Sequence, residues 1–127
     1  GETAWPIARY AEILLIYAEA SVKADGVVSA EALEAVDKIR RRAGGYDQDI
    51  YPDLPASISP DDFFEAVIAE RSYELCFECH RWFDLLRLDR IWEVNKDEFP
   101  NMPQNYKYLP KPATEMDLLP NLTQNEY

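Results

Sequence analysis

The sequence predicts an all-α fold with three parts. These are a helical hairpin over residues 7–45, one long helix over residues 59–93, and an extended, Pro-rich C-terminal tail over residues 95–127. Apolar residues recur three or four positions apart in the first half of the chain, which is typical of helices. No proline or glycine follows Pro60 until well past Leu88, whereas five prolines fall in the last 32 residues, from Lys96 to Tyr127.

The predicted hairpin has clear signals at its helix ends. Gly26 follows the first apolar stripe, where glycine adopts a left-handed backbone at little cost. Ser29 is a good N-cap for the second helix, and Gly44-Gly45 closes it. The first stripe consists of Ile7, Tyr10, Ala11, Leu14, Tyr17, Ala18 and Val22. The second consists of Ala32, Leu33, Val36, Ile39 and Ala43. Alanines in both helices predict close, tetratricopeptide-like packing, although one pair establishes no repeat.

The long helix is predicted to begin at Ser59, which caps it with a hydroxyl. Pro60 occupies the first helical position, where no hydrogen-bond donor is lost, and two acids follow at the positive end of the helix dipole. The predicted apolar face consists of Phe64, Val67, Ile68, Leu75, Trp82, Leu85 and Leu86. The tail beyond residue 95 has no sustained periodicity, so we expect it to lie over another surface.

Charged residues form a stripe along the predicted long helix. They are Glu70, Arg71, Glu74, Glu78, Arg81, Asp84 and Arg87. Pairs three or four residues apart on an exposed helix contribute only about 0.2–0.5 kcal/mol each. The stripe therefore has a second interpretation, in which it faces the other helices or the tail and its guanidinium groups bond carboxylates and backbone carbonyls.

An alternative interpretation of the same stripe is a paired-carboxylate active site with Glu70, Glu74 or Glu78 as the acid. Each of these acids has an arginine within about one helical turn, which keeps the carboxylate ionised and makes it a poor proton donor. We therefore interpret the stripe as a structural ion ladder and predict no catalytic residues.

Composition excludes several classes of partner. The chain has 127 residues, 47% of them hydrophobic, and a net charge of −11, which argues against nucleic acid and anionic membrane surfaces. It contains no apolar run long enough for a transmembrane helix and nothing that resembles a signal peptide. Since there is no initiator methionine, we expect this chain to be part of a longer protein.

Cys76-Phe77-Glu78-Cys79-His80 matches the C-x-x-C-H signature of covalent c-type haem. Met102 or Met116 could serve as second axial ligand, so the residues alone leave haem open. A zinc site would need two further ligands, and His80 is the only histidine. The helix face that carries the cysteines is rich in Glu and Arg, which is unfavourable for the apolar contacts that haem requires.

Three longer motifs indicate a family. "AVIAERSYELCFECHRWFDLLRL" resembles the C-terminal signature of the SusD/RagB family of nutrient-binding outer-membrane lipoproteins. "RYAEILLIYAEA", followed by "AVDKIRRRAGG", and the closing "YKYLPKPATEMDLLPNLTQNEY" are similar to further motifs of that family, in the same order. Cys76 and Cys79 replace residues that are usually small, so the resemblance makes the haem signature coincidental and implies no cofactor and no metal.

The resemblance implies that residues 1–127 are a single C-terminal region of a longer, mostly helical lipoprotein on the cell outer membrane of Bacteroidetes. Such proteins capture oligosaccharide or polysaccharide for uptake by a TonB-dependent transporter of the SusC type, and they are not enzymes. Contact with the membrane would be through a lipid anchor that this chain lacks. We expect this region to supply mainly scaffold.

No ligand-contacting residue is carried over from the family. Aromatic rings in loops are plausible platforms for sugars, and Trp92, Tyr106 and Tyr108 are the candidates. The alternative for each ring is that it pins the tail to a helix. The competing hypothesis for the whole chain is a helical-repeat protein-interaction module without a small-molecule site.

Overall fold

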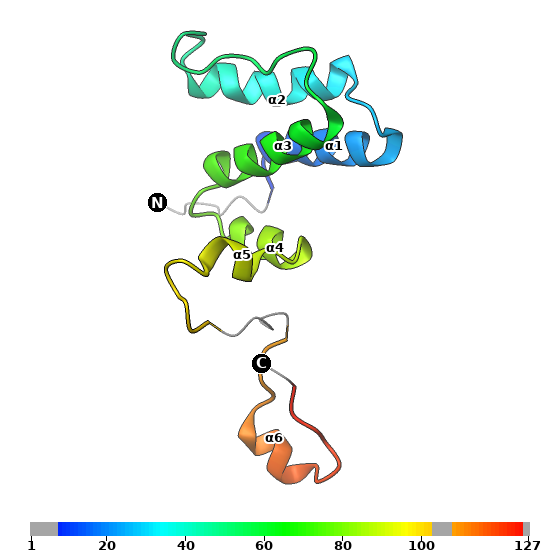
Figure 1. Ribbon diagram of the computed structural model, residues 1–127, viewed down its shortest axis with the longest axis vertical. Helices are drawn as coiled ribbons and strands as arrows, with labels where there is room; N and C mark the ends of the chain where they lie inside the picture. Colours follow the sequence, from blue (N-terminus) through cyan, green and yellow to red (C-terminus); the bar gives the residue numbers. More distant parts are fainter. Residues whose placement is uncertain (1–7, 103–107, 126–127) are drawn as a thin grey trace, which may run out of the picture. The chain divides into compact units, whose positions relative to one another are not determined.

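The computed structural model describes residues 8–102 and 108–125, and over these ranges all of its regular structure is helical (Figure 1). The all-α prediction is therefore confirmed. The chain divides into two compact units, residues 1–81 and 82–127, which are described separately below. Within the described ranges, no helix has both the length and the apolar character needed to cross a membrane.

The predicted hairpin is formed by α1 (Tyr10–Asp25) and α2 (Ala30–Ala43), which contact each other. Its end signals act as expected. Gly26 has a φ of 68° and donates its N–H to the carbonyl of Val22 at 3.0 Å. Ser29 Oγ accepts the N–H of Ala32 at 3.1 Å, which satisfies one of the donors left free at the start of α2.

The buried face of α1 differs from the predicted stripe. Leu15, Ala18 and Val22 are the buried positions, whereas Tyr10 and Tyr17 of the predicted stripe are exposed. Ile13 and Ile16 are exposed as well, so α1 carries apolar residues on more than one side. Because of this, helical spacing alone could not identify which side packs against the other helices.

The third helix of the first unit, α3 (Pro60–Glu74), begins as predicted: Ser59 Oγ accepts the N–H of Asp62 at 3.1 Å, and proline occupies the first turn. α1 contacts both α2 and α3. The largest fully buried side chains come from all three helices and are Phe63, Leu15, Val36 and Val67. Burying each such side chain contributes about 1.5–3 kcal/mol, so this core is the main source of stability in the unit.

The prediction of one long helix over residues 59–93 is wrong. α3 ends at Glu74, residues 75–79 form a turn, and two short helices follow, α4 (His80–Arg87) and α5 (Ile91–Asn95). The turn contains left-handed residues at Phe77 (φ 64°) and Cys79 (φ 65°). Neither is glycine, so the sequence contained no breaker signal. The carbonyl of Glu74, freed by the end of α3, instead accepts a hydrogen bond from the Arg9 guanidinium.

The segment between α2 and α3 runs beside α2, where Figure 1 shows it passing back toward the start of α3. Three α2 side chains hold it in place. Asp37 Oδ1 accepts the N–H of Leu54 at 2.9 Å, and Arg40 Nε donates to the carbonyl of Pro52 at 2.8 Å. Arg41 binds the carboxylate of Asp53 through Nε and Nη2. The connector is therefore ordered by polar contacts and not by apolar packing alone.

The tail contains more regular structure than expected, because α6 (Ala113–Leu118) lies within it. The chain then returns, and the side chain of Gln124 bonds the backbone of Lys111 in both directions. Its Oε1 accepts the Lys111 N–H at 2.7 Å, and its Nε2 donates to the Lys111 carbonyl at 3.0 Å. The prediction of a wholly extended tail is wrong, since this amide closes residues 111–124 into a loop around a short helix.

Candidate functional site

Several polar contacts in the first unit converge on Arg9, immediately before α1. Its Nε lies 2.9 and 3.0 Å from the two carboxylate oxygens of Glu78, and its Nη1 lies 2.5 Å from Glu74 Oε1. Its Nη2 binds Glu78 Oε1 at 2.8 Å and also the Glu74 carbonyl. One guanidinium thus joins the start of α1 to the end of α3 and the turn that follows.

Glu74 also binds α2, because Arg42 Nη2 lies 2.5 Å from Glu74 Oε2. The side chain of Glu74 is only 6% exposed, so this carboxylate links three helices from a nearly buried position. The hydrogen bond from Arg9 lowers the pKa of Glu78 below its ordinary value. An acid held ionised in this way cannot serve as a proton donor near neutral pH, which agrees with the structural interpretation of these acids.

Glu70 is the most deeply buried acid of the predicted ladder, with 2% exposure. Its Oε2 accepts hydrogen bonds from Arg40 Nη1 at 3.1 Å and from the Tyr51 hydroxyl at 2.7 Å. Burial and the bond to Glu70 raise the pKa of Tyr51 to about 12. Gly44 permits this arrangement, because a Cβ at that position would lie 2.8 Å from the Cβ of Tyr51.

The remaining members of the predicted ladder are Arg71, Arg81, Asp84 and Arg87. Arg71 is buried, Arg81 is exposed, and Arg87 Nε lies 2.9 Å from Asp84 Oδ1 within α4. The expectation of one continuous stripe is wrong, because the turn at residues 75–79 interrupts the helix. Glu70, Glu74 and Glu78 are bonded instead by arginines from the segment before α1 and from α2.

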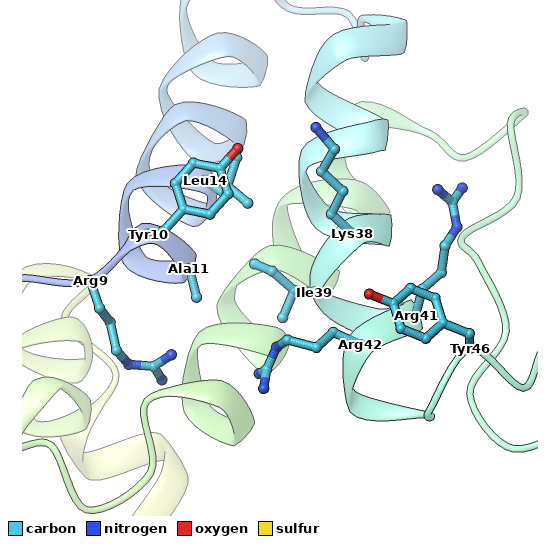
Figure 2. A pocket seen from close by; sticks show the side chains of 9 residues that line it. All are labelled: Arg9, Tyr10, Ala11, Leu14, Lys38, Ile39, Arg41, Arg42 and Tyr46. Carbon is cyan, nitrogen blue, oxygen red and sulfur yellow. The ribbon is translucent and has the colours of Figure 1, made fainter.

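A pocket of about 510 Å³ lies between the start of α1 and the end of α2 (Figure 2). Its lining residues are Arg9, Tyr10, Ala11, Leu14, Lys38, Ile39, Arg41, Arg42 and Tyr46. Figure 2 shows Ala11 and Ile39 between the two helices, with the guanidinium groups of Arg9 and Arg42 near one end. The walls thus combine an apolar floor with cationic and phenolic groups, a combination typical of sites for small polar ligands.

Comparison with known proteins identifies the family. The family model described as "SusD family" matches residues 1–127. The chain belongs to the SusD family. SusD-like proteins P2 and P25 of Formosa agariphila are 36% and 32% identical to it over 92% and 93% of the chain. The chain spans only 24% and 23% of the length of these SusD-like relatives.

Solved SusD structures have the same fold. A SusD homolog from Bacteroides thetaiotaomicron matches with a TM-score of 0.80 and 32% identity, over 95% of this chain and 26% of that one. A SusD superfamily protein from Parabacteroides distasonis matches with a TM-score of 0.70 and 33% identity, over 96% of this chain and 27% of that one. The helical arrangement described above is therefore that of a SusD-family region.

The C-x-x-C-H segment does not have the expected geometry of a haem ligand set. Cys76 and Cys79 are exposed free thiols in the turn at residues 75–79, so the expectation that a helix face carries them is wrong. His80 Nδ1 lies 3.5 Å from Glu12 Oε1, so the imidazole faces a carboxylate of α1. Among the described residues, no group of three or more His, Cys, Asp and Glu side chains is placed to hold a metal ion.

Two of the three aromatic candidates, Trp92 and Tyr108, lie within the described residues. Trp92 lies in α5, with Lys96 Nζ 5.3 Å from its ring centroid. Tyr108 is exposed, and Tyr106 lies outside the described residues. The sequence analysis missed Tyr10 and Tyr46, which flank the pocket with 68% and 75% exposure. In the sequence, the basic residues at the end of α2 and the following Gly44-Gly45-Tyr46 are a signal for a site near this end of the helix. The sequence does not show that the start of α1 lies beside them, because that depends on the tertiary fold.

Proposed function

We propose that the full-length protein captures oligosaccharide or polysaccharide at the cell outer membrane and delivers it to a TonB-dependent transporter of the SusC type. The observation that carries this proposal is the match of the SusD family model to the whole of residues 1–127. The protein is a surface-exposed lipoprotein in this proposal, and the described region serves mainly as scaffold.

The polar contacts of the first unit support a role in scaffold and not in catalysis. Glu70, Glu74 and Glu78 each accept hydrogen bonds from arginine. Glu70 and Arg40 are both largely buried, and removing one partner of such a pair costs about 3–5 kcal/mol, so Glu70 has a structural reason to be present. The exposed tyrosines of the pocket provide the aromatic surface against which a sugar ring can pack.

The test is calorimetry of the full-length protein against a panel of neutral and charged oligosaccharides, together with a pull-down of the transporter encoded beside it. We expect saturable binding to at least one saccharide and retention of the transporter. If the full-length protein retains the transporter but binds no saccharide, it is an interaction module and the capture proposal is wrong.

The interaction-module hypothesis has one specific observation in its favour. Tyr10, Ile13, Ile16 and Tyr17 are exposed along α1 of the described unit, with 68%, 53%, 47% and 45% exposure. An apolar surface of this kind is typical of a protein contact. Replacing Ile13 and Ile16 with Ser in the full-length protein tests whether this surface meets the transporter, because the change then removes transporter retention and leaves saccharide binding unchanged.

A further inference from the structure

We propose that the pocket between the start of α1 and the end of α2 binds the anionic group of an acidic saccharide, a carboxylate or a sulfate. This inference deepens the proposed function and rests on it. It assigns a location in the described region and a chemical class of ligand, neither of which follows from family membership.

The first support is the charge of the lining. The chain has 24 Asp and Glu against 13 Lys and Arg, yet four of the nine lining residues are cationic and none is acidic. A concentration of positive charge in a protein with a net charge of −11 favours an anionic ligand over a neutral or cationic one.

Two of the four cations are already engaged by acids outside the lining. Arg41 binds Asp53 through Nε and Nη2 and Glu34 through Nη1. Arg9 binds Glu74 and Glu78 through all three of its nitrogens. These two arginines shape the pocket and are not the expected ligand contacts.

Lys38 and Arg42 are the cations available to a ligand. Lys38 is exposed and forms no hydrogen bond or ion pair within the described part of the chain. Arg42 is 59% exposed and uses one terminal nitrogen, Nη2, to bind Glu74, whereas its Nε and Nη1 form no hydrogen bond within the described part of the chain. The two residues are four apart on α2, and Figure 2 shows the Lys38 ammonium and the Arg42 guanidinium extended away from each other along the helix. Each of them can bond a carboxylate or sulfate of the ligand.

The aromatic walls favour a saccharide as the rest of the ligand. Tyr10 comes from the first turn of α1 and Tyr46 from the turn after α2, so exposed rings flank the cations on both sides. Tyr46 has a φ of 67°, which is unfavourable for a residue other than glycine. Its N–H is bonded to the carbonyl of Arg41 at 2.6 Å, so the last turn of α2 fixes the backbone of Tyr46. Strained backbone of this kind clusters at ligand sites.

The test uses the full-length protein and two matched pairs of probes, with dissociation constants measured by calorimetry at low salt. One pair is oligogalacturonate and its methyl ester, and the other is a carrageenan oligosaccharide and its desulfated form. We expect the charged member of at least one pair to bind about tenfold more tightly than its neutral counterpart, and salt to weaken that binding. Inorganic sulfate alone should bind far more weakly.

Lys38→Gln should weaken binding of the charged saccharide about tenfold, to the level of its neutral counterpart, without changing the melting temperature. Tyr10→Ala should weaken binding of both members of the pair. Lys96→Gln is the control, because it makes the same charge change beside Trp92 and should leave binding unchanged. If Lys96→Gln weakens binding and Lys38→Gln does not, the anionic site lies elsewhere and the proposal is wrong.

The outcomes also separate this inference from the proposed function. If neutral saccharides bind and their charged counterparts bind no better, the anionic pocket is wrong while glycan capture stands. If inorganic sulfate binds as tightly as the charged saccharide, the saccharide part of the inference is wrong. Binding of no saccharide in this experiment or in the wider panel contradicts both proposals.

Discussion

Arg9 binds the carboxylate of Glu78, which lies 69 residues away in the sequence. Its Nε is 2.9–3.0 Å from the two carboxylate oxygens, and its Nη2 is 2.8 Å from Oε1. The same guanidinium bonds the carbonyl at the end of α3. The side chains of Arg9 and Glu78 are about one-third exposed, so water is only partly excluded from the pair. This contact links the beginning of α1 to the turn that ends α3.

We expect Arg9→Gln to lower the free energy of unfolding by about 1–3 kcal/mol, because it removes charged hydrogen bonds from two carboxylates. Denaturant unfolding of the full-length protein measures the change. A double-mutant cycle with Glu78→Gln isolates the contribution of the Arg9–Glu78 pair. The losses in the free energy of unfolding of the two single variants should sum to more than the loss of the double variant. Strictly additive losses would show that the pair contributes nothing.

The contact between Arg9 and Glu78 also predicts how the stability of the protein depends on pH. Because Arg9 lowers the pKa of Glu78 in the folded protein, the stabilisation is fully present above the ordinary value of 4.5 and is lost as the pH falls through the lowered value. Glu78→Gln should therefore reduce stability at pH 7 and flatten its fall below about pH 4.5. Thermal melting of both proteins between pH 3 and 7 tests this. If the melting temperatures of the variant and the parent change in parallel with pH, the prediction is wrong.

Cys79 offers a stabilising substitution. Its φ of 65° costs a residue with a side chain about 1–2 kcal/mol, whereas glycine adopts it freely. Since glycine also loses more entropy on folding, we expect Cys79→Gly to raise the free energy of unfolding by about 0.5–1 kcal/mol. Denaturant unfolding measures the gain. Cys79→Ala is the control and should give no gain in stability, because alanine keeps the cost of the left-handed backbone. If the two variants are equally stable, relief of backbone strain does not explain the gain.

Much of the fold of the first unit could be predicted from local signals. Gly26, Ser29 and Ser59 act at helix ends as their chemistry dictates, because capping depends on atoms within one turn of the chain. The end of α3 could not be predicted this way. Its turn is built from Phe77 and Cys79, which have no turn preference, and it is held by Arg9 from a distant part of the sequence.

The candidate site was less predictable than the fold. The sequence predicts a structural role for the acids of the ladder but does not indicate their arginine partners Arg9, Arg40 and Arg42, which come from other parts of the chain. Pairing within a helix is visible in the sequence as a spacing, whereas pairing between helices appears only once their packing is known. The pocket has the same origin, since Tyr10 and Tyr46 line one pocket only because α1 and α2 form a hairpin.

The central claim is that the buried acids of α3 stabilise the scaffold and do not contact the ligand. Glu70→Gln in the full-length protein tests it most directly, since Glu70 is buried and joins Arg40 to Tyr51. We expect the free energy of unfolding to fall by about 3 kcal/mol, because Arg40 loses its buried counter-charge. The dissociation constant for saccharide, measured below the melting transition, should stay the same. Unchanged stability together with a tenfold or greater loss of saccharide affinity would contradict the account.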